Sequence, residues 1–415
     1  MNAPPVTQRD AGLRGLSGNR PFVLLWGGQT VSAFGDALFT LAIMWAVYAQ
    51  SHSALQTAII QAVWHLSNTL FGPVGGTLVD RWDRKRTLVA GNLVAGLVVG
   101  CTAVVALQLG HLLPAVVFVA VFALNALVAV IAPARFSILP NLVKSEQLAT
   151  ASGAVTAGSQ AALFLGDTVA GVIIARAGAA WAVAIDAVSF LVASVLFGVA
   201  KLPARAASAM DSAQGWSFAR DIREGWHVIA GQPTMRALLQ LGVIINLASF
   251  IGPLYPALVR VRLHAGAAAY GALGATSVIG AAAGGLMAGA IEKRIGAGQQ
   301  LIAGWALAGA CALGIALSTW LVATAALEAV LAFGITVGSV AMTTLNQSLI
   351  SEKHRGRVYG IMVGLGAITI PASALLAGWL ADVLGPAPLF AVAGVIILGV
   401  AGMAWASAPV RTARL

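Results

Sequence analysis

The chain has 415 residues, of which 59% are apolar and only 9% are charged, and its formal net charge is +10. A water-soluble fold carries about 25% charged residues, so the soluble classes are excluded. The charges fall in short clusters separated by apolar runs of about 20 residues, the length at which a helix crosses about 30 Å of hydrocarbon. The composition therefore predicts an all-α membrane protein with many spans.

Several other classes are excluded by particular residues. Cys101 and Cys311 both lie inside apolar runs, which argues against a disulfide framework or a cysteine-rich metal site. No Lys follows a Gly, so a P-loop is absent, and no H-E-x-x-H pair occurs. The basic residues flank the apolar runs and do not alternate with aromatic residues. We therefore expect no enzyme activity, no cofactor, no metal and no nucleic-acid partner.

The hydrophobic runs predict twelve transmembrane helices. In chain order they span 21–49, 56–79, 87–107, 113–139, 146–175, 181–200, 235–259, 267–290, 300–317, 320–345, 358–383 and 388–405. The first 20 residues are polar, and the first apolar run is too long for the hydrophobic region of a signal peptide. Short connections between some of these runs favour antiparallel neighbours.

The distribution of basic residues predicts the orientation in the membrane. Of the 24 Lys and Arg residues, only Arg176, Arg260 and Arg262 fall on the side opposite the N-terminus. Lys and Arg accumulate in cytoplasmic loops of membrane proteins. We therefore expect both termini to be cytoplasmic, in the inner membrane of a bacterium.

The chain divides at its only long polar segment, residues 201–234. We predict an N-terminal six-helix bundle over 1–200, a cytoplasmic linker over 201–234 and a C-terminal six-helix bundle over 235–415. Within the linker, 216–229 fits either an amphipathic helix on the membrane surface or a solvated connection. Asp80-Arg81 after the second span is echoed by Glu292-Lys293 after the eighth, which suggests two pseudo-symmetric halves.

A spaced motif lies between the second and third spans. It reads Gly76-x-x-x-Asp80-Arg81-x-Asp83-Arg84-Lys85-Arg86. A carboxylate at such a membrane edge can accept hydrogen bonds from the open N-terminus of another helix. The alternative interpretation is that the basic cluster only sets the topology.

This motif resembles the G-x-x-x-D-R-x-G-R-R pattern of the major facilitator superfamily, with Asp83 where the pattern has Gly. Further segments are similar to its macrolide-efflux and enterobactin-exporter branch: Trp26-x-x-Gln29-x-x-Ser32-x-x-Gly35-Asp36, Pro133-Ala-Arg135, Asp186-x-x-Ser189-Phe190 and Arg355-Gly356-Arg357-Val358. The resemblance implies the major facilitator fold. It also implies that Gly76, Asp80, Arg81, Arg84, Lys85 and Arg86 form a conformational latch, in which the acid meets the start of the eleventh span.

Four acids fall inside the predicted spans: Asp36, Asp167, Asp186 and Glu328. An Asp at the middle of a membrane helix costs roughly 2.5–3.5 kcal/mol, and no Lys or Arg lies near the middle of a span to pair with them. Such a carboxyl group is expected to take up or release a proton near neutral pH.

The four acids are not equal candidates for proton or substrate binding. We rank Asp36 first, with Gln29 two turns before it on the same face, followed by Glu328 and Asp167. Structural hydrogen bonding is the alternative for each, and we favour it for Asp186. Asp382, at the outer end of the eleventh span, is expected to be merely solvated.

Together these observations predict a secondary active transporter. The branch resemblance implies export of amphipathic small molecules, such as drugs or siderophore-like compounds, by alternating access, with protons as the coupling ion in an antiport. The alternatives are a proton-coupled importer of a small metabolite and a non-transporting membrane scaffold or sensor. The expected partners are a small-molecule substrate, protons and the lipid bilayer, and the expected state is a monomer.

Overall fold

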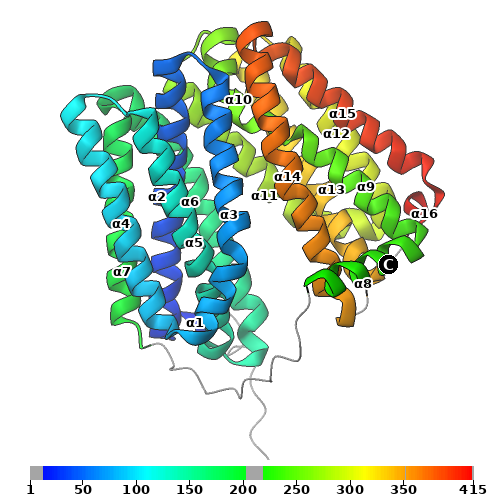
Figure 1. The fold of residues 1–415 in the computed structure, drawn as a ribbon, viewed down its shortest axis with the longest axis horizontal. Helices are drawn as coiled ribbons and strands as arrows, with labels where there is room; N and C mark the ends of the chain where they lie inside the picture. The colour runs from blue at the N-terminus through cyan, green and yellow to red at the C-terminus, as the bar shows by residue number, and fades with distance from the viewer. Residues whose placement is uncertain (1–12, 202–217, 351, 414–415) are drawn as a thin grey trace, which may run out of the picture. The chain divides into compact units, whose positions relative to one another are not determined.

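A computed structural model of the chain describes residues 13–201, 218–350 and 352–413. Within these ranges, only the main chain is described for 13–14, 73–81, 136, 218–222, 352–357, 359, 363 and 367. The described residues form helices joined by short connections, with no strand among them (Figure 1). The all-α prediction is therefore confirmed.

The first seven α-helices cover the N-terminal half of the chain. They are α1 (Leu13–Ser17), α2 (Arg20–Ser51), α3 (Ala54–Arg81), α4 (Arg84–Leu109), α5 (Pro114–Leu142), α6 (Leu148–Ala177) and α7 (Ala179–Val199). A short 3-10 turn, η1 (Ser145–Gln147), precedes α6.

The C-terminal half begins with α8 (Phe218–Gly231). The seventh predicted span is made of α9 (Pro233–Asn246), the 3-10 turn η2 (Leu247–Phe250), α10 (Ile251–Ala257) and the π-helical turn η3 (Leu258–Arg262). The remaining helices are α11 (Ala267–Ile295), α12 (Ala297–Leu317), α13 (Leu321–Leu349), α14 (Glu352–Leu384), α15 (Pro386–Ala406) and α16 (Ala408–Arg411).

Each of the twelve predicted spans coincides with a helix or with a continuous series of helical turns. In the described part of the chain, 11 of these helices are long and apolar enough to cross a membrane. The helix at the second predicted span, α3, is 28 residues long, which is also ample for 30 Å at 1.5 Å per residue. The predicted spans are therefore borne out as helices.

Contacts divide the chain into two compact units. The first unit contains Met1–Val47 and Leu66–Ala209, and the second contains Tyr48–His65 and Met210–Leu415. The end of α2 and the start of α3 thus belong with the second unit, although the rest of both helices belongs to the first. The functional division into 1–200, 201–234 and 235–415 stays a prediction.

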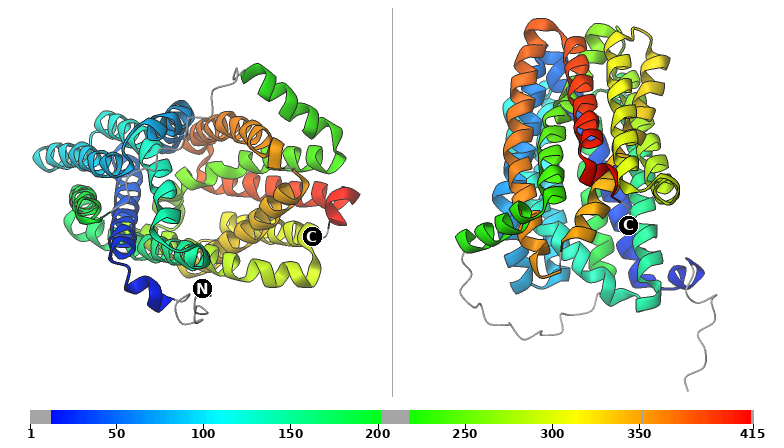
Figure 2. Two further views of the ribbon diagram at one scale, coloured as in Figure 1. Left: turned by 90° about the horizontal axis from the view of Figure 1, so that it is seen from below. Right: turned by 90° about the vertical axis from the view of Figure 1, so that its right-hand side faces the viewer.

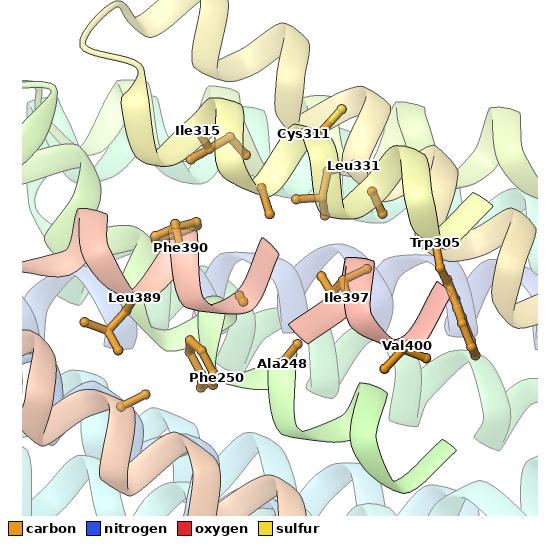
Figure 3. Close-up of a cluster of buried hydrophobic side chains, with 14 of the residues drawn as sticks. Ala248, Phe250, Trp305, Cys311, Ile315, Leu331, Leu389, Phe390, Ile397 and Val400 are labelled. Carbon is orange, nitrogen blue, oxygen red and sulfur yellow. The ribbon is translucent and has the colours of Figure 1, made fainter. Parts of the chain in front are cut away.

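The core of each unit is made by helices whose small residues allow close packing. In the first unit, α4 packs against both α5 and α7, around Leu88, Ile131 and Phe197. In the second unit, α12 packs against α13 and α15. Figure 3 shows Ile397 and Val400 of α15 among the side chains of this second core.

Part of the polar linker is helical, as one of the two alternatives predicted, and its position on the membrane surface stays a prediction. The helix α8 runs across the long helices of its unit instead of alongside them (Figures 1 and 2). Its Ile229 is buried in a cluster with Met235 and Leu239 of α9, whereas Trp226 is exposed. One face of α8 is therefore anchored on its own unit.

Candidate functional site

The first unit gathers three of the predicted acids around the middle of α2. Gly35 lies so close to α7 that an added methyl group would overlap the side chains of Asp186 and Ser189. At Gly166 of α6, an added Cβ would lie 2.6 Å from the Cβ of Ala37. Because Asp36 lies between Gly35 and Ala37, it is on a segment of α2 that both α6 and α7 approach closely.

Asp186 is the most deeply placed of these acids. Its side chain is 0% exposed, and its Oδ1 accepts a hydrogen bond of 3.0 Å from the Ser189 hydroxyl one turn later. Its Oδ2 is buried and has no hydrogen-bond partner among the described residues. The bond to Ser189 agrees with the structural role that we favoured, but the second oxygen is left unsatisfied.

A cation comes close to Asp36, contrary to the expectation that the intramembrane acids have none. Arg135 lies within α5, and its guanidinium attracts the Asp36 carboxyl group electrostatically. Its Nε is buried without a hydrogen-bond partner among the described residues. Asp186, in turn, is within range of electrostatic repulsion from Asp36. The site therefore contains two carboxyl groups and one guanidinium.

The other two predicted residues of the first unit lie on the same helices. Gln29 is buried, with 4% of its side chain exposed, two turns before Asp36 on α2. Asp167 follows Gly166 on α6 and is half-buried. The Trp26 indole nitrogen donates to the Ala154 carbonyl oxygen over 2.9 Å and ties α2 to α6. The roles of Gln29 and Asp167 in binding stay predictions.

The second unit holds Glu328 in a different environment. This residue of α13 is 4% exposed, and its Oε2 accepts a hydrogen bond from the Tyr255 hydroxyl of α10. Ser277 of α11 also interacts with this carboxyl group. The Tyr255 ring stacks edge-to-face on Phe390 of α15, with 5.2 Å between ring centroids, so four helices position this one carboxyl group.

The predicted latch is described only in part. The side chains of Gly76, Asp80 and Arg81 lie outside the described residues, as does most of the start of α14. Arg84 donates to the Ser137 carbonyl oxygen over 3.0 Å and joins α4 to α5. Lys85 is half-buried and Arg86 is exposed. A latch made by these residues stays a prediction.

Asp83 departs from the family pattern for a local structural reason. It is the N-cap of α4, and its Oδ1 accepts a hydrogen bond of 2.8 Å from the Arg86 backbone N–H. Asp is among the favoured residues at this position because the first N–H groups of a helix have no intrahelical acceptor. The substitution of Asp for Gly therefore fixes the start of α4.

Sequence reasoning missed three residues of these sites. Arg135 was placed near the cytoplasmic end of the fourth predicted span, too far from mid-span to be considered a partner for the acids, but its guanidinium attracts Asp36. Tyr255 gave a usable signal, since a tyrosine between two prolines inside a span needs a partner for its hydroxyl. Asp382 is exposed, as expected, but it is not merely solvated: its carboxylate accepts hydrogen bonds from the start of α3.

Two curated relatives are similar to this chain. Macrolide efflux protein A of Streptococcus pyogenes is 26% identical over 224 residues, which are 54% of this chain and 54% of that protein. The match thus spans about half the length of that relative. Enterobactin exporter EntS of Citrobacter koseri is 23% identical over 375 residues, 89% of this chain and 88% of that protein.

The fold is also found among solved structures. The nucleoside transporter NupG superimposes with a TM-score of 0.74 over 93% of this chain and 98% of that one, at 9% sequence identity. At this identity the likeness concerns the fold alone, and it agrees with the predicted major facilitator architecture.

The family model described as Major Facilitator Superfamily matches residues 25–371, which include Asp36, Arg135, Asp186 and Glu328. These relatives are transport proteins and not enzymes. From the helices, the buried acids and this match, we conclude that the chain belongs to the major facilitator superfamily of multi-pass membrane transporters.

Proposed function

We propose that this protein exports amphipathic small molecules by proton antiport, with Asp36 as the group that binds the proton or a cationic substrate. The observation that carries the proposal is the half-buried Asp36 beside Arg135 and Asp186. With both acids ionised, this cluster has one more negative than positive charge. Inside a membrane that imbalance favours uptake of a proton or a cation.

The direction of transport rests on the two efflux relatives, whose names describe macrolide efflux and enterobactin export. The excess of acidic over basic groups around Asp36 suits a cationic cargo of the drug type, and the enterobactin relative suggests a siderophore-like compound as the other candidate. The excess of basic residues on one side supports cytoplasmic termini. We further propose that the protein lies in a bacterial inner membrane and acts as a monomer. Gln29, Asp167 and Glu328 are the further proposed contacts for protons or substrate.

The test compares dye accumulation in cells that produce the wild type, Asp36→Asn or Glu146→Gln. Glu146 is an exposed acid at the start of the fifth predicted span, in the turn before α6, so it controls for the loss of one carboxylate. Export by the wild type should lower the dye content of the cells. We expect Asp36→Asn to abolish this effect and Glu146→Gln to retain it. Equal accumulation with the wild type and Asp36→Asn would remove Asp36 from the mechanism.

Purified protein in vesicles with an imposed pH gradient tests coupling and direction. Export by antiport predicts that substrate crosses the membrane in the direction opposite to proton flow. Asp36→Asn should then allow only exchange of substrate for substrate. Substrate movement in the same direction as protons would instead identify an importer. If no compound in the panel stimulates proton flux, the scaffold alternative is favoured.

A further inference from the structure

The α2–α3 tip, which we define as residues 48–65, is held by a carboxylate of another helix. Asp382 near the end of α14 accepts hydrogen bonds from the Ser53 hydroxyl over 2.6 Å, from the Ala54 N–H and from the Leu55 N–H over 3.3 Å. The first N–H groups of α3 have no acceptor within their own helix. Asp382 therefore caps α3 from outside and favours it electrostatically.

The packing around this cap is close. At Gly378, one turn before Asp382, an added Cβ would lie 2.7 Å from the Cβ of Ala58 and 2.9 Å from the Ala54 carbonyl oxygen. Glycine allows the backbones of α3 and α14 to approach at this distance. The tip is thus docked on α14 by both shape and charge.

The same tip also bonds to the interrupted seventh span. The buried Thr57 hydroxyl lies 2.8 Å from the Pro253 carbonyl oxygen. One turn further along α3, the Gln61 side-chain N–H group donates to the Ser249 carbonyl oxygen over 3.4 Å. That carbonyl would bond to the N–H of residue 253 in a regular helix, but proline has none. Gln61 therefore gives the Ser249 carbonyl oxygen a donor that Pro253 cannot supply, and the Thr57 hydroxyl, which also lies 2.8 Å from the Ala54 carbonyl oxygen, joins α3 to α10.

Tyr255, whose hydroxyl donates to Glu328, lies two residues after Pro253 on this same short helix. The residues around it are the least regular of any span, with a 3-10 turn before α10 and a π-helical turn after it. Such interruptions occur mostly at functional or strained positions. A continuous set of contacts thus runs from Asp382 through Thr57 and Pro253 to Tyr255 and Glu328.

We propose that Tyr255 is a positioning residue for Glu328 and that the docked α2–α3 tip holds it in place. Release of the tip and loss of the Tyr255–Glu328 hydrogen bond are then coupled events. The inference rests on the proposed function, because it connects Glu328, a proposed proton or substrate contact, to the docking and release of the α2–α3 tip. Such coupling is reciprocal, so a change at Glu328 must alter the docking of the tip as much as a change at Asp382 alters the Tyr255–Glu328 hydrogen bond.

Amide hydrogen exchange measures the docking directly, because the Ala54 and Leu55 N–H groups bond to Asp382 and not within α3. The full-length protein in lipid nanodiscs is compared with Asp382→Asn, Tyr255→Phe, Glu328→Leu and the Tyr255→Phe/Glu328→Leu double variant. Two controls, Thr276→Val and Thr369→Val, remove hydroxyls that bond to carbonyls of their own helices.

We expect Asp382→Asn to speed exchange at Ala54 and Leu55 at least tenfold. Tyr255→Phe and Glu328→Leu, which lie away from these amides, should each speed it at least threefold, and the double variant no more than either alone. Glu328→Gln keeps an oxygen that accepts from Tyr255, so it should restore slow exchange. Both controls should remain within twofold of the wild type.

Unchanged exchange in Tyr255→Phe and Glu328→Leu would overturn the coupling, and unchanged exchange in Asp382→Asn would overturn the cap itself. Circular dichroism of each variant identifies any that is unfolded, and Glu328→Gln then provides the comparison at that position. The measurement needs neither substrate nor a pH gradient. Its failure is therefore distinguishable from failure of the transport proposal, which is tested at Asp36 in the other unit.

Discussion

Asp36 in the first unit and Glu328 in the second are both acids inside membrane spans, but their neighbours differ in kind. Asp36 is half-buried, attracted by Arg135 and repelled by Asp186. Glu328 is almost fully buried, its carboxyl group accepts a hydrogen bond from the Tyr255 hydroxyl, and Ser277 interacts with it as well. One unit thus offsets the cost of a buried acid with an opposite charge, and the other does so with neutral donors.

The two environments differ in what the loss of a partner side chain would cost. A charge partner cannot be removed without leaving an uncompensated charge in a medium that solvates it poorly. A neutral donor leaves an unsatisfied acceptor, which costs less. The first unit should therefore be the more sensitive to loss of a single side chain. Three substitutions test this comparison.

Arg135→Met should have the largest effect on stability. It removes the cation and leaves two acids close together, so the free energy of unfolding should fall by about 3–5 kcal/mol. Thermal unfolding in detergent measures it, with the exposed Arg176→Met as the control, for which we expect about 0.5 kcal/mol or less. Adding Asp36→Asn to Arg135→Met should recover most of the loss. Strictly additive effects would show that the two side chains do not interact.

Tyr255→Phe should cost less, roughly 1.5–3 kcal/mol, because one hydrogen bond to Glu328 is lost while the Phe390 contact remains. The same unfolding measurement applies. Glu328→Gln retains an acceptor for the Tyr255 hydroxyl and should be milder. If Tyr255→Phe proved as damaging as Arg135→Met, the distinction between charged and neutral compensation would not hold.

Gly35→Ala tests whether close packing brings α2 to Asp186. The added methyl group would overlap the Asp186 and Ser189 side chains, and such overpacking typically costs about 1–3 kcal/mol. Gly153→Ala on α6 is the matched control, since nothing lies within 4 Å of an added Cβ there; alanine in a helix should stabilise by roughly 0.5–1 kcal/mol. Equal behaviour of the two variants would argue against a tight α2–α7 contact.

The helices could be predicted from the sequence because the length of an apolar run depends only on neighbouring residues. About 20 apolar residues cross a membrane whatever they pack against, so each of the twelve predicted runs falls on a helix or helical series, 11 of which are long and apolar enough to cross a membrane in the described part of the chain. The intramembrane acids were found in the same way, since a charge within an apolar run stands out. The polar linker left a choice between helix and coil, and α8 resolved it in favour of a helix.

The partners of these acids could not be predicted, because they come from distant parts of the chain. Asp36 and Arg135 are 99 positions apart in the sequence, and Tyr255 and Glu328 are 73 apart. Which face of α5 or α10 meets the acid depends on packing between helices, not on hydrophobicity. Asp382 was misjudged for the same reason: a carboxylate at a membrane edge looks solvated until a helix start is placed against it.

The bonds from α3 to the seventh span carry a consequence for redesign of this protein. Replacing Thr57 or Gln61 by valine or leucine would raise the hydropathy of α3, and insertion scales would score the change as an improvement. Yet loss of Gln61 would strip a donor from the Ser249 carbonyl oxygen, for which lipid offers no substitute, and loss of Thr57 would remove the hydroxyl that joins α3 to α10. At Thr57 and Gln61 a more apolar side chain should therefore destabilise the protein, although apolar side chains are usually favoured within a bilayer.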